Sequence, residues 1–206
     1  MYARSTTMRI EPGAVDELVA VVGEEILPMV TQQEGCVGLS LLVDRNSGRC
    51  ITTSAWETAE AMQGSAERVR ESRERVALRF GTTAEVQQWE VAVLHRAQPA
   101  GDGACARVAW LRTDPANLGR VVDAYRDSLM PWWERTPGFR SNSLLVDRDT
   151  GRSSSALVFE SRDAMARTRD QFTTLREEFA QRMGIQIEEV AEFDVALAHL
   201  RAPETV

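Results

Sequence analysis

The chain contains one sequence pattern twice, and this internal repeat constrains its fold more than any other feature. The stretch SLLVDRNSGR at residues 40–49 recurs as SLLVDRDTGR at residues 143–152, an offset of 103 residues. At that offset, 13 of the 35 residue pairs between the segments 28–62 and 131–165 are identical. We therefore predict two copies of one structural unit, residues 1–97 and 105–206, joined by a Gly/Pro/Ala-rich linker over residues 98–104.

Each repeat alternates strand and helix patterns. A strand pattern over residues 2–10 precedes Pro12, which suits the first turn of a helix because its missing N–H needs no partner there. The helix that follows meets Pro28, which should kink it or end its regular part. A strand, the hairpin VDRNSGR, a further strand, one amphipathic helix over residues 60–80 and a last strand complete the repeat. The order βαββαβ predicts an α+β fold of two tandem ferredoxin-like units.

The fourth strand of each repeat predicts how the two sheets are covered. VQQWEVAVLH and VAEFDVALAH place apolar side chains on both faces of the strand. A four-stranded sheet with helices on one face needs cover for the other. We therefore expect the sheets to pack face to face within one chain, as an intrachain dimeric α/β-barrel.

Composition and charge narrow the classes of partner and compartment. The chain has 24 Lys+Arg and 31 Asp+Glu, a net charge of −7, which disfavours nucleic acid and anionic membranes as partners. The N-terminus lacks an apolar signal region, and no apolar stretch reaches the length of a membrane span, so a cytoplasmic protein is expected. The spacing of Cys36, Cys50 and Cys105 fits no zinc or redox template and indicates reduced structural thiols.

The repeats resemble a known family. The residues that carry the resemblance are EGCVGLSLLVDRNSGR with SAWETAEAM in the first repeat, and PGFRSNSLLVDRDTGR with LVFESRDAM in the second. They resemble the antibiotic-biosynthesis-monooxygenase-like proteins of the dimeric α/β-barrel superfamily, over nearly the whole chain. The resemblance implies oxidation of aromatic or polyketide-type substrates without a cofactor. The family also includes haem-degrading enzymes and proteins without known activity, and fold alone does not transfer a reaction.

The haem-degrading branch of this family is disfavoured by the residues present. The resemblance would require an Asn on the first strand and a haem-ligating His on the second helix. Trp56 could fill the aromatic position of that branch, but the first strands contain no Asn, and the only histidines are His95 and His199 on the fourth strands. We expect neither haem, nor another cofactor, nor a metal site.

Aromatic residues gather in the second repeat and are the main candidates for a ligand site. Four of them stand where the first repeat has Thr7, Met29, Val30 and Cys36, and stacked aromatics can line a pocket for a flat ligand. With two further candidates, the predicted substrate-binding set is Trp110, Trp132, Trp133, Phe139, Asn142 and Trp56. The alternative is that these aromatics fill the core or the interface between the units.

Polar residues in the expected central strands are a second group of candidates. Thr52, Ser54, Ser153 and Ser155 would line a wet cavity between the two sheets, together with Asn142 and Ser143, or would pair their hydroxyls across strands. His95 and His199 could act as general bases, or could cap or cover the strand ends. No nucleophile elbow, phosphate loop or dinucleotide motif is present.

Two main functional hypotheses follow, beside a third, a divergent haem binder, which would need an unexpected axial ligand such as His95, His199 or a Met. The first is a small-molecule-binding protein with an apolar or aromatic ligand and an oxygenase reaction whose catalytic residues the sequence does not identify. The second is a non-catalytic binding or regulatory scaffold of the same fold. A homo-oligomer of the fused pair is compatible with either hypothesis.

Overall fold

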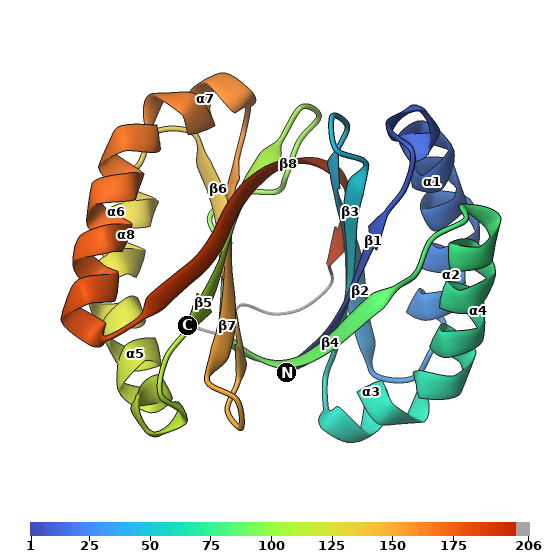
Figure 1. Cartoon of the computed structure of the whole chain (residues 1–206), viewed down its shortest axis with the longest axis horizontal. Coiled ribbons are helices and arrows are strands. Elements are labelled where there is room, and N and C mark those ends of the chain that lie inside the picture. The colour runs from blue at the N-terminus through green and yellow to red at the C-terminus, as the bar shows by residue number, and fades with distance from the viewer. Residues whose placement is uncertain (201–206) are drawn as a thin grey trace. The chain divides into compact units, whose positions relative to one another are not determined.

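The structure is a computed structural model of the chain and describes residues 1–200. It contains two compact units, each with a sheet and a layer of helices (Figure 1). Unit 1 comprises Met1–Trp89 and the stretch that begins at Asp194, and unit 2 comprises Glu90–Phe193. Among the described residues, no helix is long and apolar enough to cross a membrane.

Both repeats form the predicted order of elements. In the first repeat these are β1 (Tyr2–Arg9), η1 (Pro12–Ala14), α1 (Val15–Val21), η2 (Val22–Ile26), α2 (Leu27–Thr31), β2 (Cys36–Asp44), β3 (Arg49–Trp56), α3 (Ala59–Gly64), α4 (Ala66–Arg79) and β4 (Glu85–Arg96). In the second they are β5 (Cys105–Arg112), η3 (Pro115–Asn117), α5 (Leu118–Ala124), η4 (Tyr125–Leu129), α6 (Met130–Glu134), β6 (Phe139–Asp147), β7 (Arg152–Phe159), α7 (Arg162–Arg167), α8 (Arg169–Met183) and β8 (Gln186–Leu200).

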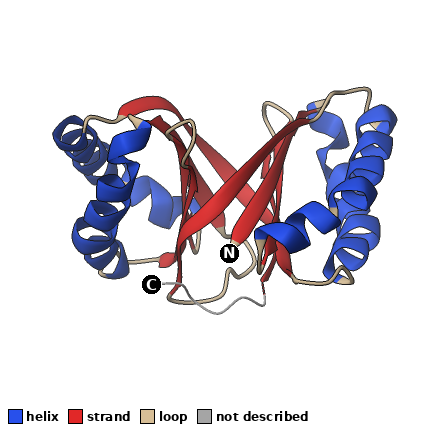
Figure 2. Ribbon diagram, turned by 90° about the horizontal axis from the view of Figure 1, so that it is seen from below, coloured by secondary structure: helices blue, strands red, loops and turns tan. Residues whose placement is uncertain are grey.

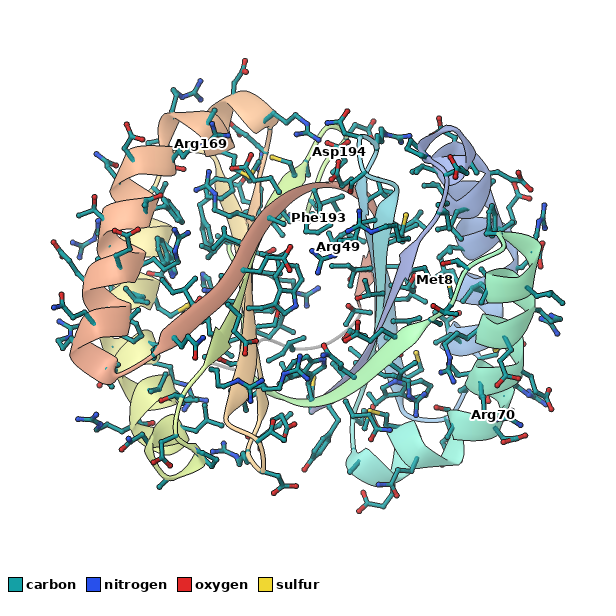
Figure 3. The ribbon with its side chains drawn as sticks, in the orientation of Figure 1. Met8, Arg49, Arg70, Arg169, Phe193 and Asp194 are labelled. Carbon is teal, nitrogen blue, oxygen red and sulfur yellow. The ribbon has the colours of Figure 1, made fainter. Side chains whose placement is uncertain are left out.

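The two long strands β4 and β8 each belong to both sheets. The sheet of unit 1 has the order β4-β1-β3-β2-β8, and that of unit 2 has the order β8-β5-β7-β6-β4. Strand β8 changes sheets at the neighbouring residues Phe193 and Asp194, labelled in Figure 3, and from Asp194 it pairs with β2. Strand β4 pairs with β6 from Glu90 onward.

The predicted fold class is confirmed. The strand order β1-β3-β2-β8-β5-β7-β6-β4 closes on itself, which is the topology of an eight-stranded barrel built from two ferredoxin-like repeats. The compact units do not coincide with the repeats, because the end of β4 belongs to unit 2 and the end of β8 belongs to unit 1. The borders of the repeats at residues 97 and 105 remain a prediction.

Helices cover one face of each sheet (Figure 2). In unit 1 they bury an aliphatic core that contains Leu41, Val43 and Trp56. In unit 2 they bury a larger and more aromatic core, with Phe159, Phe172 and Trp133. Because side chains alternate along a strand, only one phase of β1 or β5 points toward these helices.

The first helix of each repeat passes its proline by way of a π turn. The α-helix is interrupted after Val21, in agreement with the irregularity predicted from the proline. The chain stays helical to Thr31, through the π turn η2 and then α2. Proline has no N–H to donate to the carbonyl four residues earlier. The N–H of Leu27 donates to Val22 O, five residues back, and this widened turn leads into Pro28. The second repeat does the same before Pro131, where Met130 N–H donates to Tyr125 O.

The prediction of a single amphipathic helix over residues 60–80 was wrong, because the structure has two helices there, α3 and α4. Thr58 caps the first with its Oγ1, which accepts a hydrogen bond from Ala61 N at 3.1 Å. The break falls at Ser65, whose Oγ donates to Met62 O at 2.7 Å and so competes with the backbone for that carbonyl. Thr168 bonds to Met165 O at the same point of the second repeat.

The repeated hairpin requires its glycine for two reasons. Gly48 and Gly151 have φ near +70°, in the left-handed region that disfavours side chains. A Cβ atom would also lie 1.8 Å from Ile10 O at Gly48 and 2.0 Å from Thr113 O at Gly151. These glycines let the hairpin pack against the chain that leaves β1 or β5.

Candidate functional site

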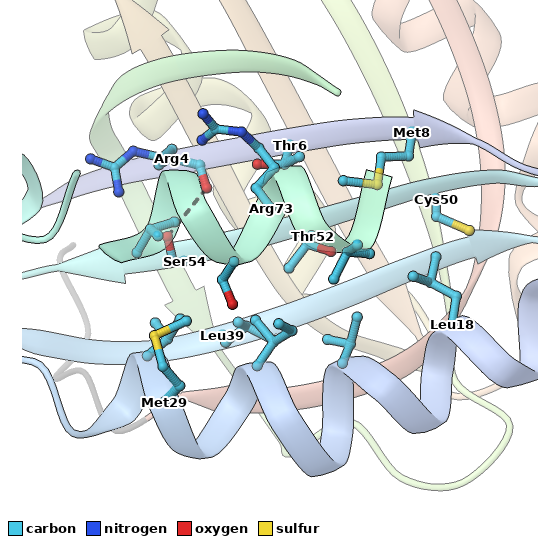
Figure 4. Close-up of a pocket in the computed structure, with 16 residues that line it drawn as sticks. Arg4, Thr6, Met8, Leu18, Met29, Leu39, Cys50, Thr52, Ser54 and Arg73 are labelled. Atoms are coloured by element: carbon cyan, nitrogen blue, oxygen red, sulfur yellow. Dashed lines mark hydrogen bonds between the residues drawn. The ribbon is translucent and has the colours of Figure 1, made fainter. Parts of the chain in front are cut away.

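Each unit contains a cavity between its sheet and its helices, built from equivalent positions of the two repeats. In unit 1 the strands β1, β2 and β3 face helix α4 and the first-repeat helix with its π turn η2 (Figure 4). The cavity measures about 60 Å³ in unit 1 and about 50 Å³ in unit 2. Both are lined mainly by apolar side chains and both receive two arginines.

The unit 1 cavity holds a buried arginine at the break between α3 and α4. Arg4 is 3% exposed and points from β1 toward the helices. Its Nη2 donates to Met62 O at 2.5 Å and its Nη1 donates to Ser65 Oγ at 3.2 Å. The interrupted helix therefore supplies the neutral acceptors that hold this guanidinium in place.

A second arginine lies next to the first. Arg73 of α4 reaches the cavity beside Arg4 (Figure 4). Burial, and then the charge of Arg73, lower the pKa of the Arg4 guanidinium from its ordinary value. Within residues 1–200, neither guanidinium makes an ion pair with a carboxylate. This end of the cavity therefore carries two uncompensated positive charges.

Arg107 of unit 2, the counterpart of Arg4, has a carboxylate partner that Arg4 lacks among the described residues. Arg107 is 5% exposed and donates to Met165 O at 3.0 Å, like its counterpart Arg4. It also forms an ion pair with Glu192, at 3.0 Å between Nη2 and Oε1. Glu192 accepts a further hydrogen bond from Arg169 at 3.0 Å. The repeat places Gln88 at the position of Glu192, so unit 1 has a neutral amide there.

Aromatic side chains line the unit 2 cavity where unit 1 has valines. The Trp133 and Phe172 rings stack at 4.3 Å between centroids and 21° between planes. Tyr125 packs edge-on against Phe179 at 6.4 Å. The repeat pairs Tyr125 with Val22, Trp133 with Val30, Phe172 with Val69, and Phe179 with Val76.

A buried polar network surrounds the Tyr125 hydroxyl. Asn142 Nδ2 donates to this oxygen at 2.6 Å, and Ser155 Oγ lies 2.9 Å from it, where either hydroxyl can donate. Burial raises the pKa of Tyr125 to about 12, against the opposing effect of these hydrogen bonds and of the nearby Trp133 indole. The hydroxyl is therefore protonated at neutral pH and available as a hydrogen-bond donor.

Several buried donors that line the unit 2 cavity have no hydrogen-bond partner within residues 1–200. They are Arg107 Nη1, Arg176 Nε and Trp133 Nε1. The Trp133 indole lies near the Tyr125 hydroxyl but does not meet hydrogen-bond geometry. Burial lowers the pKa of the Arg176 guanidinium; the charge of Glu177 opposes this shift, and the charge of Arg107 adds to it. Buried donors are almost always paired in folded proteins, so an acceptor from a ligand would satisfy a real deficit.

The structure brings some of the predicted site residues together. Trp133 lines the unit 2 cavity, and Asn142 supports it through Tyr125. Trp132 packs edge-on against Trp133 at 5.0 Å, on the outer side of that stack, and borders a surface hollow instead. Phe139 belongs to the unit 2 core and stacks on His95 at 6.2 Å.

The other two predicted residues do not line either cavity. Trp110 lies on the opposite face of β5 from Arg107 and contacts Phe193 edge-on at 6.3 Å. Trp56 is fully buried in the unit 1 core, and its Nε1 donates to Ser54 Oγ at 3.0 Å. Trp56 therefore positions a cavity-lining hydroxyl.

The polar strand residues line the cavities, but on a different face from the one predicted. Thr52 and Ser54 face the helices of unit 1, and Ser153 and Ser155 face those of unit 2. These residues line cavities between sheet and helices, because the alternation of a strand gives two phases without saying which one the helices cover. Neither His95 nor His199 is among the cavity-lining residues.

Sequence reasoning missed the arginines and the tyrosine of the cavities. Arg4 and Arg107 occupy equivalent positions of the two repeats. Each lies on the same face of its strand as an apolar residue, Met8 or Leu111, and this pattern could have predicted an inward-pointing charge. Tyr125 occupies one of the apolar positions at helical spacing, so its hydroxyl leaves no separate signal in the sequence. Within residues 1–200, no group of three or more His, Cys, Asp or Glu side chains is arranged to bind a metal ion.

The fold, with a cavity in each unit, is that of monooxygenase-like proteins, and sequence comparison agrees. The family model described as antibiotic biosynthesis monooxygenase matches residues 1–69. The uncharacterized protein Rv2558 of Mycobacterium tuberculosis is 49% identical over all of this chain and 88% of its own length. The uncharacterized protein Rv2557 of the same organism is 45% identical over all of this chain and 92% of its own length. The chain belongs to the antibiotic biosynthesis monooxygenase family.

Solved structures share the fold at low sequence identity. An anthrone oxidase-like protein superposes with a TM-score of 0.67 and 16% identity, covering 99% of this chain and 95% of that one. A monooxygenase-like protein of Listeria innocua has a TM-score of 0.58 and 11% identity, with 95% and 94% covered. The haem-degrading enzyme of Listeria monocytogenes has a TM-score of 0.53 and 10% identity, with 93% and 98% covered.

Proposed function

We propose that the protein binds a flat, oxygen-bearing aromatic molecule in the unit 2 cavity and oxidises it with molecular oxygen. The observation that carries this proposal is a set of buried donors without partners among the described residues: Arg107 Nη1, Arg176 Nε and Trp133 Nε1. They lie in a cavity otherwise lined by apolar and aromatic groups and two serines. A ring fits aromatic walls, and a phenol, anthrone or quinone oxygen accepts hydrogen bonds.

The chemistry proposed for this site needs no protein base. For an anthrone-type substrate, loss of a ring CH₂ proton to solvent gives an electron-rich enolate, whose negative charge Arg176 would stabilise. Arg107, already paired with Glu192, would donate a hydrogen bond to it from Nη1. One molecule of O₂ then converts the CH₂ carbon to C=O, and its second oxygen atom leaves as water with the two displaced hydrogens. Tyr125, kept protonated by burial, would donate to the substrate oxygen.

A ligand of this size requires movement of the cavity walls. The roughly 150 Å³ of an engineered benzene-binding cavity shows the space that one ring needs, whereas this cavity measures about 50 Å³. The π turn η4, which supplies Tyr125 and Leu129, is the element expected to shift, since π turns are irregular and occur often at functional sites.

The alternative function is a non-catalytic binding or regulatory scaffold of the same fold. One observation favours it: among the described residues, no carboxylate or imidazole lines the unit 2 cavity to accept a proton. Binding and oxidation must therefore be measured separately.

The test is a thermal-shift screen with anthrones and dihydroxynaphthalenes, followed by oxygen-electrode assays of the compounds that bind. A specific ligand at a hundredfold excess over Kd stabilises the folded state by about 2.7 kcal/mol. Tyr125→Phe should weaken binding about tenfold, as expected for one lost hydrogen bond. Trp110→Ala, on the other face of β5, is the control and should leave the ligand-induced shift unchanged. Binding without oxygen uptake favours the scaffold, and no binding contradicts both functions.

A further inference from the structure

We infer that the unit 1 cavity is a separate binding site for a small amphipathic carboxylate, with its carboxylate against Arg4 and Arg73 and its aliphatic body against the helix-facing apolar residues. This ligand differs in charge and shape from the aromatic molecule proposed for unit 2. The inference therefore stands whether or not unit 2 binds an aromatic compound.

The first observation is that the buried positive charge of Arg4 has no counter-ion among the described residues, which is unfavourable for the folded protein. Arg4 is 3% exposed, and within residues 1–200 it is balanced by no carboxylate, only by the neutral acceptors Met62 O and Ser65 Oγ and by the Trp56 ring, whose centroid lies 6.0 Å from the guanidinium carbon. The charge of Arg73 repels it. Buried charges in proteins are normally paired, because burial without a counter-ion is strongly unfavourable. An anion bound here would supply the missing counter-charge to both guanidinium groups.

The second observation comes from the equivalent position in unit 2. There Glu192 pairs with Arg107 at 3.0 Å and neutralises it from within the chain. The repeat places Gln88 at this position in unit 1, on the exposed surface of β4. A neutral amide takes the place of the one carboxylate that the architecture provides, so the positive charge of unit 1 remains directed at the cavity.

The lining of the cavity indicates the chemical class of the anion. Guanidinium groups bind carboxylates through paired N–H···O bonds, and the three hydroxyls of Thr6, Thr52 and Ser54 lie in the same wall. Apart from the Ser72 hydroxyl and the Cys50 thiol, the rest of the lining is aliphatic or thioether, and among the described residues it contains no aromatic ring, which suits an alkyl chain. It includes Met8, Leu18, Val22, Ile26, Met29 and Val76.

An alkyl chain longer than a few carbons must displace part of this lining, since the cavity measures about 60 Å³. Met8 and Met29, on opposite walls in Figure 4, are the side chains best suited to move. Methionine is unbranched and changes rotamer at low cost.

The experiment is isothermal titration calorimetry of the full chain with octanoate, and with octan-1-ol as the uncharged ligand of equal chain length. Octanoate should bind the wild-type protein at least tenfold more tightly than octan-1-ol. Gln88→Glu recreates the ion pair of unit 2 and should weaken octanoate binding at least tenfold. The position is exposed, so circular dichroism and the melting temperature should stay close to those of the wild type.

The matched control is Gln87→Glu, which adds the same charge to the neighbouring position on the opposite face of β4 and should change octanoate affinity less than twofold. Absence of octanoate binding, equal binding of octan-1-ol, or equal weakening by both Glu variants would overturn the inference. Tyr125→Phe in unit 2 should leave octanoate binding unchanged, so failure here is distinguishable from failure of the proposed aromatic site.

Discussion

The cavities of unit 1 and unit 2 have the same architecture and opposite internal chemistry. Each places an arginine of the first strand against the carbonyl at a helix break, Met62 O in unit 1 and Met165 O in unit 2. Unit 2 neutralises its arginine with Glu192 and lines its cavity with aromatic rings, whereas unit 1 keeps the charge and has aliphatic walls. A duplicated fold thus supplies two sites that can differ in ligand while sharing the geometry that positions the guanidinium.

The largest expected effect tests whether the aromatic lining of unit 2 is a structural core. Trp133→Ala removes a ring that is 3% exposed and stacked on Phe172, and should lower the free energy of unfolding by about 4 kcal/mol. Val30→Ala, at the same position of unit 1, should cost about 2 kcal/mol because fewer buried atoms are lost. Urea denaturation followed by circular dichroism measures both. Equal costs would show that the aromatic stack adds no stability beyond that of the valine it replaces.

The next effect should be the same in both units. Gly48→Ala and Gly151→Ala each force a side chain into positive φ and against a backbone carbonyl, and each should cost about 3 kcal/mol. The same denaturation experiment gives both values. A difference of more than about 1 kcal/mol between the two variants would mean that the hairpins are not equivalent in energy.

A smaller effect depends on pH and concerns the ion pair that only unit 2 has. Partial burial raises the pKa of Glu192, but hydrogen bonds and charges from Arg107 and Arg169 outweigh it, so the net pKa lies below the ordinary 4.5. A carboxyl with a lowered folded pKa stabilises the fold above its unfolded pKa, and this contribution is lost as the pH falls through the folded value. At pH 7, Glu192→Gln should cost about 2 kcal/mol.

This cost should shrink as the pH falls below 4.5, because protonated Glu192 no longer differs in charge from Gln. Unfolding free energies of wild type and variant between pH 3 and pH 7 provide the measurement. A difference that stays constant over this range would show that the charge of Glu192 does not stabilise unit 2.

The smallest expected effect concerns the second arginine of each cavity. Arg73→Met should leave the free energy of unfolding unchanged or raise it by up to about 0.5 kcal/mol, because it removes a charge that repels Arg4. Arg176→Met, its counterpart in unit 2, should behave alike, since burial disfavours that charge too. A loss above about 1 kcal/mol for either variant would assign that arginine a structural role.

The sequence by itself determined the order of elements and the class of the fold. The offset between the copies makes Arg4 equivalent to Arg107 and Gly48 equivalent to Gly151, and the prolines predicted an irregularity in the first helix of each repeat. These features are local, since they depend on side-chain periodicity and on residues with special backbone geometry. Trp133 was a candidate because it departs from the other copy of the repeat, and Asn142 because it is polar in an expected central strand; their role in binding stays a prediction.

Only the tertiary structure decided where the sites lie. Strand alternation gave two phases for β1 and β5, and packing of the helices selected the phase that points into the cavities. The contact between Arg107 and Glu192 joins residues 85 positions apart, on a strand that changes sheets one residue later. Such contacts depend on strand register and helix packing across the fold, which no local pattern encodes, so the charge difference between the two cavities became apparent only when the chain was folded.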